Sequence, residues 1–326
     1  MNKTYPLKNS PLYGMRNRTK LALLLGLNKN YFSKIHKYTY NCFSRPKPNG
    51  GERYFTEPTG ELKLIQKRIN RLLSRIETPN WVTSGKKQNS YVTNAQRHRN
   101  NLFVKTMDIS QFYESVQRGK VYKLFRDTFK MEKDICWLMT NLVTYKGKLP
   151  TGSPTSQLIV YWAYSQMFEE ISTIALDNEC EFTLYVDDMT FSSMHPISNK
   201  LREEVDKILK KDDLKAKSKK DHYYQSDVFK VVTGVGIQNG ELRALNGKKK
   251  QILDKYRECK ASHNLYEIEK LKGMLCSLRQ IESGIFPEIY NFVKHFDDDL
   301  KVLSKNRYYQ RKRNRTYNLK CFADDV

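Results

Sequence analysis

The chain of 326 residues is predicted to be an α+β protein in which short antiparallel strands form hairpins and longer helices pack beside them. Runs of β-forming residues meet at turn-forming pairs, as on either side of Asp187-Asp188 and of Asn239-Gly240. Longer segments repeat apolar residues every three or four positions, which is typical of amphipathic helices. A hydrophobic content of 39% is sufficient for a substantial core in one or two domains.

The first third of the chain contains two helical regions and two strand regions. Residues 1–40 are expected to be mainly helical, and residues 41–60 to form strands interrupted by Pro and Gly. Residues 61–78 have apolar spacing of three and four, which predicts a helix. Residues 102–109 are rich in β-formers, and an amphipathic helical pattern follows them. The apolar members of that pattern are Val116, Val121, Leu124, Phe125 and Phe129.

The remaining helices and strands are predicted from the same apolar spacing and turn-forming pairs. Residues 155–176 predict one long helix, and residues 228–237 predict a strand. Asn239-Gly240 predicts a type I′ turn that returns the chain into a strand at 241–245. From about residue 247 the pattern is helical, with one apolar stripe. The stripe consists of Leu265, Ile268, Leu271, Leu275, Leu278 and Ile281.

Asp187 and Asp188 are expected at the tip of a hairpin between apolar residues 181–184 and 189–192. Adjacent carboxylates repel each other, so their place beside apolar strands suggests a bound cation. Mg²⁺ prefers hard oxygen ligands and sites that it shares with phosphates. A simple polar turn is the alternative interpretation of this pair.

Asp108 is a third candidate carboxylate, because it ends the predicted strand 102–109 just before a helix. Phosphoryl transfer by two metal ions, which lie about 3.5–4 Å apart, requires such an acid on a neighbouring element. Taken alone, Asp108 would be interpreted as a helix N-cap. Together with the Asp187-Asp188 hairpin it predicts half of a metal site.

The net charge of +23 predicts a polyanionic partner. Repulsion among so many positive charges opposes a compact fold, and a bound polyanion would neutralise them. The apolar run near the N-terminus, residues 21–27, is too short for a membrane span. It has a basic lead-in, as a signal peptide does, but it is only seven residues long and no small-residue cleavage site follows, so we expect an N-terminal helix packed on the fingers instead. The six cysteines are scattered without a Cys-x-x-Cys pair, which argues against a zinc site. We therefore expect buried free thiols in the cytoplasm and no membrane association.

The order of these segments resembles the palm motifs of reverse transcriptases. Asp108 on a strand is followed by Leu149-Pro150-Thr151-Gly152-Ser153-Pro154-Thr155-Ser156 and then by Tyr185-Val186-Asp187-Asp188. The segment from Lys47 to Arg53 and the helix after it resemble that family's fingers, and Lys219-Lys220 resemble its fourth palm motif. The resemblance extends over roughly residues 30–285 and implies a right-hand polymerase fold of fingers, palm and thumb. We expect fingers and palm in residues 1–240 and a helical thumb with a basic tail in 241–326.

Two further segments resemble signatures of bacterial retron reverse transcriptases. Asn94-Ala95-Gln96-Arg97-His98 fits their Asn-Ala-x-x-His pattern, and Val232-Thr233-Gly234 fits their Val-Thr-Gly pattern. We assign Asn94 and His98 as RNA-binding candidates on this resemblance. By default, the His98 side chain is expected to be a structural hydrogen-bonder rather than a catalyst. The basic, tyrosine-containing C-terminal segment adds three more RNA-binding candidates, because it can contact phosphates and stack on bases. These are Tyr308, Arg311 and Arg313.

The resemblance implies a role for each matching residue. Asp108, Asp187 and Asp188 would bind two Mg²⁺ ions, with the Ile109 carbonyl as a further ligand. Five residues would contact the nucleotide: Arg53, Lys47, Tyr113, Gly152 and Lys220. Among these, Arg53 and Lys47 would contact the triphosphate, the Tyr113 ring would exclude a 2′-hydroxyl, and Gly152 would let the backbone approach closely.

Three positions depart from the family pattern. Thr151 stands where many relatives carry Gln, and Val186 stands where retron enzymes often carry Ala. Asp221 stands where Thr is common, which weakens the assignment of Lys220. None of these departures removes a carboxylate.

The implied function is RNA-directed DNA synthesis in a retron. The primer would be a guanosine 2′-hydroxyl of a cognate noncoding RNA, and the substrates dNTPs. The product would be msDNA, single-stranded DNA joined to that RNA by a 2′–5′ branch. An effector protein encoded in the same locus would act with it in anti-phage defence. Two alternatives remain: a reverse transcriptase of abortive-infection or intron-derived type, and an RNA-binding scaffold with a vestigial site.

Overall fold

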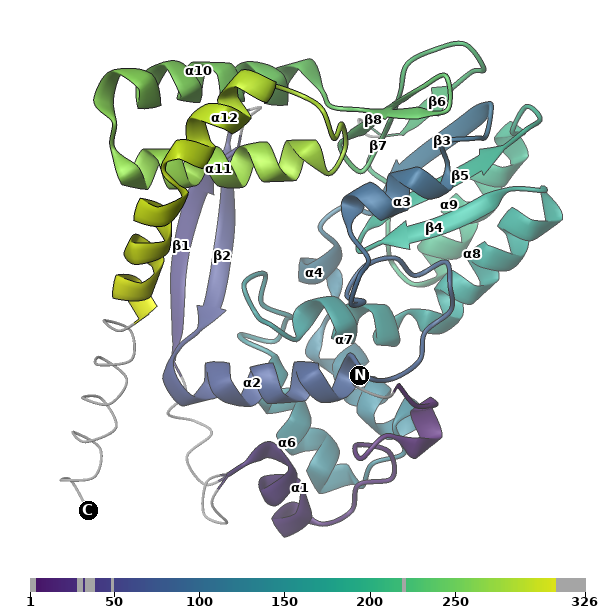
Figure 1. Ribbon diagram of the computed structural model, residues 1–326. Coiled ribbons are helices and arrows are strands. Elements are labelled where there is room, and N and C mark those ends of the chain that lie inside the picture. Colours follow the sequence, from purple (N-terminus) through teal and green to yellow (C-terminus); the bar gives the residue numbers. More distant parts are fainter. Residues whose placement is uncertain (1–3, 28–31, 33–38, 48–49, 219–220, 309–326) are drawn as a thin grey trace. The chain divides into compact units, whose positions relative to one another are not determined.

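The computed structural model of the chain describes residues 4–27, 32, 39–47, 50–218 and 221–308. The chain divides into two compact units, residues 1–233 and 234–326 (Figure 1). The helices of the first unit are η1 (Leu7–Asn9), α1 (Arg18–Leu25), α2 (Gly60–Leu73), α3 (Tyr91–Arg97), α4 (Phe112–Ser115), α5 (Arg118–Lys123), the π-helical η3 (Leu124–Thr128), α6 (Lys133–Val143), α7 (Ser156–Ala163), α8 (Ser165–Asp177) and α9 (Asn199–Lys211). Its strands are β1 (Tyr40–Pro46), β2 (Glu52–Pro58), β3 (Phe103–Asp108), β4 (Glu181–Tyr185), β5 (Asp188–Ser193), β6 (His222–Tyr224) and β7 (Lys230–Val232).

The main sheet of the first unit has the strand order β4-β5-β3-β6. β5 pairs antiparallel with both β4 and β3, and β3 pairs antiparallel with β6. The predicted hairpin at 181–192 and the predicted strand at 102–109 therefore become neighbours, although the intervening helices separate them in sequence. This antiparallel sheet with its helices confirms the predicted α+β class.

Alternate residues of these strands lie on opposite faces of the sheet. On one face, Phe182 of β4 and Phe191 of β5 stack at 5.0 Å between ring centroids and belong to the apolar core. On the other face, Asp108 lies directly opposite Asp188, and Ser192 lies further along β5. In the β4–β5 hairpin, large apolar side chains therefore lie on one face, and the hydroxyls of Thr183 and Ser192 lie on the face that also bears Asp188.

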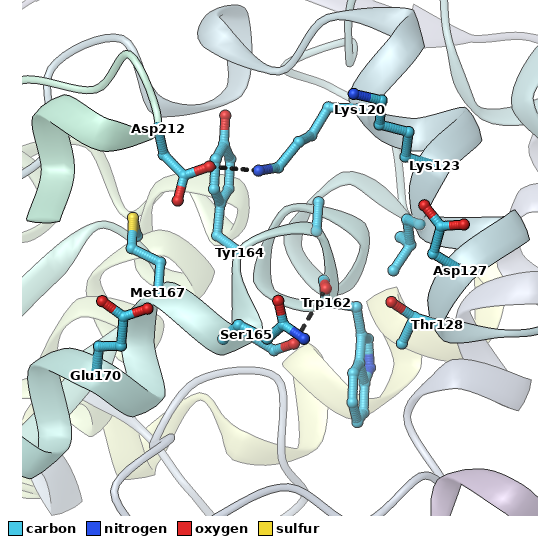
Figure 2. Close-up of a pocket in the computed structure, with 13 residues that line it drawn as sticks. Lys120, Lys123, Asp127, Thr128, Trp162, Tyr164, Ser165, Met167, Glu170 and Asp212 are labelled. Atoms are coloured by element: carbon cyan, nitrogen blue, oxygen red, sulfur yellow. Dashed lines mark hydrogen bonds and ion pairs between the residues drawn. The ribbon is translucent and has the colours of Figure 1, made fainter.

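The prediction of one long helix over residues 155–176 is wrong in one respect, because the segment forms two helices. α7 ends at Ala163 and α8 begins at Ser165, and the residue between them, Tyr164, has φ −120° and ψ 17°, outside the helical region. The Tyr164 ring is buried, and the Lys120 ammonium lies 4.6 Å from its centroid (Figure 2). Tertiary contacts of this side chain therefore accompany a break that periodicity does not signal.

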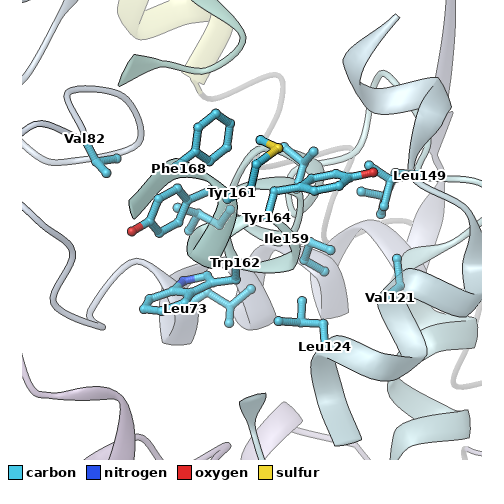
Figure 3. Packing of buried hydrophobic residues seen from close by; sticks show 14 of the residues in the cluster. Leu73, Val82, Val121, Leu124, Leu149, Ile159, Tyr161, Trp162, Tyr164 and Phe168 are labelled. Atoms are coloured by element: carbon cyan, nitrogen blue, oxygen red, sulfur yellow. The ribbon is translucent and has the colours of Figure 1, made fainter. Parts of the chain in front are cut away.

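The core of the first unit is rich in aromatic rings. Figure 3 shows Tyr161 and Trp162 of α7 and Phe168 of α8 among aliphatic side chains such as Leu73 and Leu124. The apolar residues predicted for the segment after Asp108 are all buried as well. They are Val116, Val121, Leu124, Phe125 and Phe129. The segment itself is divided among α4, α5 and η3, because Val116 has an extended backbone (ψ 97°).

The predicted strand region at 41–60 is confirmed as the hairpin β1–β2. Phe43 and Phe55 stack across it at 5.3 Å between ring centroids, and Arg45 lies opposite Arg53 in the register. The prediction of a mainly helical N-terminus is confirmed only in part. Among the described residues before β1, the named helices are η1 and α1. Gly26 caps the C-terminus of α1 with a φ of 71°, the left-handed conformation that glycine favours.

The second unit contains β8 (Val235–Gln238), β9 (Glu241–Arg243), α10 (Asn246–Ser262), α11 (Leu265–Arg279) and α12 (Pro287–His295), and residues 297–308 are also helical. β8 and β9 form the predicted hairpin, and Asn239 (φ 51°) and Gly240 (φ 74°) have the positive φ angles that a type I′ turn requires. Most of the predicted stripe on α11 is buried, which confirms its amphipathic character.

No helix in the described parts of the chain combines the length and apolar character needed to cross a bilayer. The expectation of buried thiols is confirmed for Cys136, Cys180 and Cys259. It is wrong for Cys42 and Cys276, which are exposed.

Candidate functional site

Backbone pairing brings the three predicted carboxylate residues to adjacent positions. Asp108, the last residue of β3, is the direct cross-strand partner of Asp188, the first residue of β5. The Ile109 amide donates a hydrogen bond to the Asp187 carbonyl oxygen at 3.1 Å, and the Lys217 amide donates one to the Asp108 carbonyl oxygen at 2.7 Å. Asp108 is buried, with 4% of its surface exposed.

The turn that carries Asp187 has an unusual conformation. Val186 has φ 62°, a region that β-branched residues rarely occupy and that costs about 1–3 kcal/mol. The Val186 amide donates a hydrogen bond to the buried Ser84 hydroxyl at 3.0 Å. Ser84 lies outside the hairpin in sequence, so a separate segment of the chain supports the turn.

The three carboxylates supply hard oxygen donors, which are the ligands that Mg²⁺ prefers. In the parts of the chain that the structure describes, no three His, Cys, Asp or Glu side chains are arranged as a ready-made metal site. The backbone nevertheless places Asp108 opposite Asp188, and carboxylate oxygens are ligands that suit a divalent cation.

Tyr113 lies within electrostatic range of the carboxylates. Burial raises the pKa of its phenol well above the ordinary value, and the negative charge of Asp187 raises that pKa further, whereas the positive charge of Arg53 opposes the shift. Asp187 and Arg53 are thus close enough to Tyr113 for their charges to act on its phenol. Arg53 also lies over the Phe55 ring, 5.7 Å from its centroid.

Gly152 is in close contact with the β1–β2 hairpin. Its amide donates a hydrogen bond to the Thr56 carbonyl oxygen at 3.1 Å, and a Cβ built on Gly152 would lie 2.9 Å from that oxygen. Its neighbour Thr151 donates from its hydroxyl to the Tyr54 carbonyl oxygen at 2.9 Å. The close approach that the structure shows at Gly152 is therefore to the protein's own β2 strand, whereas the sequence interpretation placed it at the nucleotide.

The two remaining candidates for nucleotide contact, Lys47 and Lys220, lie beside or within segments that the structure does not describe. Lys47 lies at the hairpin end of β1, where its amide donates to the Gly51 carbonyl oxygen at 2.9 Å. Lys220 lies outside the described residues. Asp221, the unexpected residue beside it, forms ion pairs with Lys105 of β3, at 3.4 Å, and with Arg202 of α9.

Asn94 and His98 are completely buried, each with 0% exposure. The prediction that these two side chains contact RNA directly is therefore wrong, and both act inside the protein. The interpretation of His98 as a structural histidine holds. Among the tail candidates, Tyr308 is described and 64% exposed. Arg311 and Arg313 lie outside the described residues.

Sequence reasoning missed the residues that support the hairpin, namely Thr83, Ser84, Thr183 and Ser192. A signal was present for two of them. Thr183 and Ser192 are polar residues that alternate with the apolar residues of their strands, and both are fully buried. Buried hydroxyls require hydrogen-bond partners, so such positions mark a polar network.

A pocket of about 390 Å³ lies elsewhere on the first unit, where Lys120, Asp212 and Glu170 are among its lining residues (Figure 2). Lys120 and Asp212 form an ion pair across it. Its lining includes none of the three aspartates, and its mixed charge does not favour a polyanion.

Comparison with known proteins identifies the family. Residues 45–234, more than half of the chain, match the family described as reverse transcriptase (RNA-dependent DNA polymerase). The chain is 24% identical over 305 residues to the retron Ec86 reverse transcriptase of Escherichia coli, covering 91% of this chain and 92% of that protein. It is 26% identical over 198 residues to the retron Se72 reverse transcriptase of Salmonella heidelberg (strain 579083-10), covering 58% of this chain and only 51% of that protein.

Solved structures show a more distant likeness. A foamy viral protease-reverse transcriptase in complex with RNA/DNA hybrid is 16% identical, with a TM-score of 0.42 over 79% of this chain and 30% of that chain. An apo telomerase from Candida tropicalis is 11% identical, with a TM-score of 0.46 over 64% of this chain and 55% of that chain. Similarity of this size adds nothing to the family assignment, which depends on the sequence match. The chain belongs to the reverse transcriptase family of RNA-dependent DNA polymerases, and the curated proteins to which it is similar include several retron reverse transcriptases.

Proposed function

We propose that this chain is the RNA-directed DNA polymerase of a retron, which copies a cognate structured noncoding RNA into DNA. The observation that carries the proposal is the placement of Asp108 directly opposite Asp188, with Asp187 bonded through its backbone to Ile109, inside the region that matches reverse transcriptases. The similarity to retron enzymes supports the finer assignment.

Asp108, Asp187 and Asp188, with the Ile109 carbonyl, would hold two Mg²⁺ ions. When bound, such ions lower the pKa of the attacking hydroxyl and neutralise charge on the triphosphate and the departing pyrophosphate. The three carboxylates act as ligands and not as general bases, because phosphoryl transfer depends mainly on positioning and charge stabilisation.

The nucleotide would bind beside these carboxylates. The Tyr113 ring would occupy the space of a 2′-hydroxyl and so select dNTPs, and its proximity to Asp187 and Arg53 supports this placement. Arg53 would bind the triphosphate through its planar guanidinium. Lys47, Gly152 and Lys220 remain further candidates for nucleotide contact.

The primer would be a guanosine 2′-hydroxyl of the cognate RNA, and the product msDNA with a 2′–5′ branch. Tyr308, Arg311 and Arg313 would contact that RNA, and the net charge of +23 favours such a partner. An effector protein from the same locus would join the complex in anti-phage defence, in the cytoplasm. We assign fingers and palm to residues 1–240 and a thumb to 241–326, close to the division between the two compact units.

The proposal is tested by expressing the chain with its native upstream DNA and analysing the bound nucleic acid on a denaturing gel. After RNase treatment we expect a discrete DNase-sensitive band whose mobility changes with debranching enzyme. Asp187→Asn with Asp188→Asn should abolish the band and leave RNA binding intact, because only metal ligands are removed. The matched control is Asp298→Asn with Asp299→Asn, an exposed adjacent pair, which should leave the band unchanged.

The outcomes separate the alternatives. DNA from the Asp187/Asp188 double variant would refute the site assignment. Synthesis on a generic template-primer without a branched product would indicate an abortive-infection or intron-derived type of enzyme. RNA binding without any nucleotide incorporation would indicate a scaffold with a vestigial site.

A further inference from the structure

A buried polar network connects both retron-like segments to the hairpin that carries Asp187 and Asp188. We use the name buried polar network for six residues, which come from five separate segments of the first unit. They are Thr83, Asn94, His98, Thr183, Ser192 and Thr233. Five of them are at most 3% exposed, and Thr233 is half-buried.

His98 joins the two strands of the hairpin. Its Nε2 lies 2.7 Å from the Thr183 hydroxyl on β4, and its Nδ1 lies 2.7 Å from the Ser192 hydroxyl on β5. Asn101 donates a second hydrogen bond to the Ser192 hydroxyl at 2.6 Å. Because residues two apart share a face, Thr183 lies on the same face as Tyr185, and Ser192 on the same face as Asp188. His98 therefore holds the two strands together on the face that bears the carboxylates.

Asn94 joins the same hairpin at its turn. The Thr83 hydroxyl lies 2.6 Å from Asn94 Oδ1 and 3.0 Å from the Leu184 carbonyl oxygen, so it shares its proton between these two acceptors. The Thr83 amide donates to the same Leu184 oxygen at 2.9 Å. The next residue, Ser84, accepts the hydrogen bond from the Val186 amide. The residues on both sides of Tyr185 are thus held by a segment whose position Asn94 helps to set.

The network also reaches the end of the first unit. Asn94 Nδ2 lies 3.4 Å from the Thr233 hydroxyl, which in turn donates to the Tyr91 carbonyl oxygen at 2.8 Å. Thr233 has φ 47°, a strained conformation for a β-branched residue. The two segments that resemble retron signatures are therefore in contact with each other, with no surface left on Asn94 or His98 for a ligand.

Burial keeps His98 neutral. Desolvation, assisted by the positive charge of Arg97, lowers the pKa of His98 from 6.5 to about 3. A neutral imidazole donates from one nitrogen and accepts at the other, and each nitrogen here faces a hydroxyl that can do either. A fully satisfied buried network of this kind restricts the position of the strands that it joins.

We propose that Asn94 and His98 are positioning residues, which fix the Tyr185–Asp188 turn relative to Asp108 through Thr83, Thr183 and Ser192. This inference depends on the proposed polymerase function. Catalytic geometry is sensitive to small displacements, and a misplacement of about 1 Å can reduce a rate roughly 100-fold. The network accordingly governs the chemical step and the affinity for metal, and RNA affinity is independent of it.

The test compares Thr183→Val with Thr183→Ser in the full-length chain. Valine removes the hydroxyl that faces His98 and keeps the volume, whereas serine keeps the hydroxyl. We expect Thr183→Val to reduce kcat by roughly 10-fold or more and to raise the Mg²⁺ concentration for half-maximal activity, with Kd for RNA unchanged. Thr183→Ser should keep kcat and the Mg²⁺ concentration for half-maximal activity close to the wild-type values. Thr140→Val is the matched control, since Thr140 is equally buried and its hydroxyl donates to the Cys136 carbonyl oxygen of its own helix, at 2.7 Å.

Each outcome decides the matter. The inference is overturned if wild type is active and Thr183→Val behaves like Thr140→Val, or loses activity only in proportion to its unfolded fraction. It is also overturned if RNA affinity falls while kcat and the Mg²⁺ requirement stay the same. A wild-type protein that incorporates no nucleotide would instead refute the proposed function, and the inference with it.

Discussion

Replacement of Gly152 by alanine should loosen the contact between the Pro150–Ser153 segment and β2. A Cβ at this position would lie 2.9 Å from the Thr56 carbonyl oxygen, 3.1 Å from its carbon and 3.2 Å from Glu57 Cα. All three are backbone atoms of a paired strand, so no flexible side chain can move aside. The strand or the segment must shift, and the hydrogen bond from the Gly152 amide to Thr56 weakens.

The magnitude follows from the two effects. Overpacking typically costs about 1–3 kcal/mol, and a lost backbone hydrogen bond about 0.5–1.5 kcal/mol. A combined loss of about 2 kcal/mol would lower the Tm of a unit of this size by roughly 4–8 °C. Because β2 also carries Arg53, its displacement should raise KM for dNTPs by roughly 5- to 30-fold, which corresponds to a loss of about 1–2 kcal/mol of binding.

The assay is thermal unfolding together with steady-state incorporation on a generic template-primer. Gly119→Ala is the control, because Gly119 lies in α5 with no atom within 4 Å of the new Cβ. Alanine there should raise stability by about 0.4–1 kcal/mol and leave KM unchanged. Equal stability and KM for Gly152→Ala and wild type would refute the argument from close backbone contact.

Two further predictions concern buried titratable groups. The pKa of His98 is lowered from 6.5 to about 3, so below pH 6.5 the unfolded chain binds a proton that the folded chain does not bind. The contribution of His98 to the free energy of unfolding is therefore complete above pH 6.5. It is lost as pH falls, by up to about 1.4 kcal/mol per pH unit. Urea midpoints at several pH values should therefore fall less steeply for His98→Gln than for wild type, and parallel curves would contradict this. Asp221→Asn should destabilise the protein by about 3 kcal/mol, because it leaves the buried Lys105 without a counter-charge. The control, Asp298→Asn, changes an exposed carboxylate and should leave the urea midpoint unchanged. Equal urea midpoints for the two variants would show that the ion pair of Lys105 is dispensable.

Local patterns in the sequence were sufficient for much of the fold. The Asn239-Gly240 turn was predictable because few residue pairs adopt positive φ at both turn positions. The strand region that forms β1 and β2 followed from its Pro and Gly residues, and the buried stripe of α11 followed from periodicity. The break at Tyr164 was not predictable, because its apolar neighbours continue a helical pattern across it and only tertiary contacts distinguish it.

The candidate site divides in the same way. Asp108, Asp187 and Asp188 could be chosen from the sequence because adjacent carboxylates repel each other unless a cation is bound, and because the order of the segments resembles reverse transcriptases. Asn94 and His98 could also be chosen, and a structural role was expected for His98, but the partners of both side chains could not be predicted, since side-chain burial depends on which segments fold over them. Thr83 and Ser84 offered no local pattern at all.

The sequence by itself determined the chemistry of the chain, namely three acids in a reverse-transcriptase order, a strongly basic charge and the elements that carry them. Tertiary structure alone decided which distant residues meet. It placed Asp108 opposite Asp188, enclosed His98 between Thr183 and Ser192, and set Gly152 against Thr56. The physical reason is that turn and helix preferences act over a few neighbouring residues, whereas strand register and burial arise only when remote segments pack together.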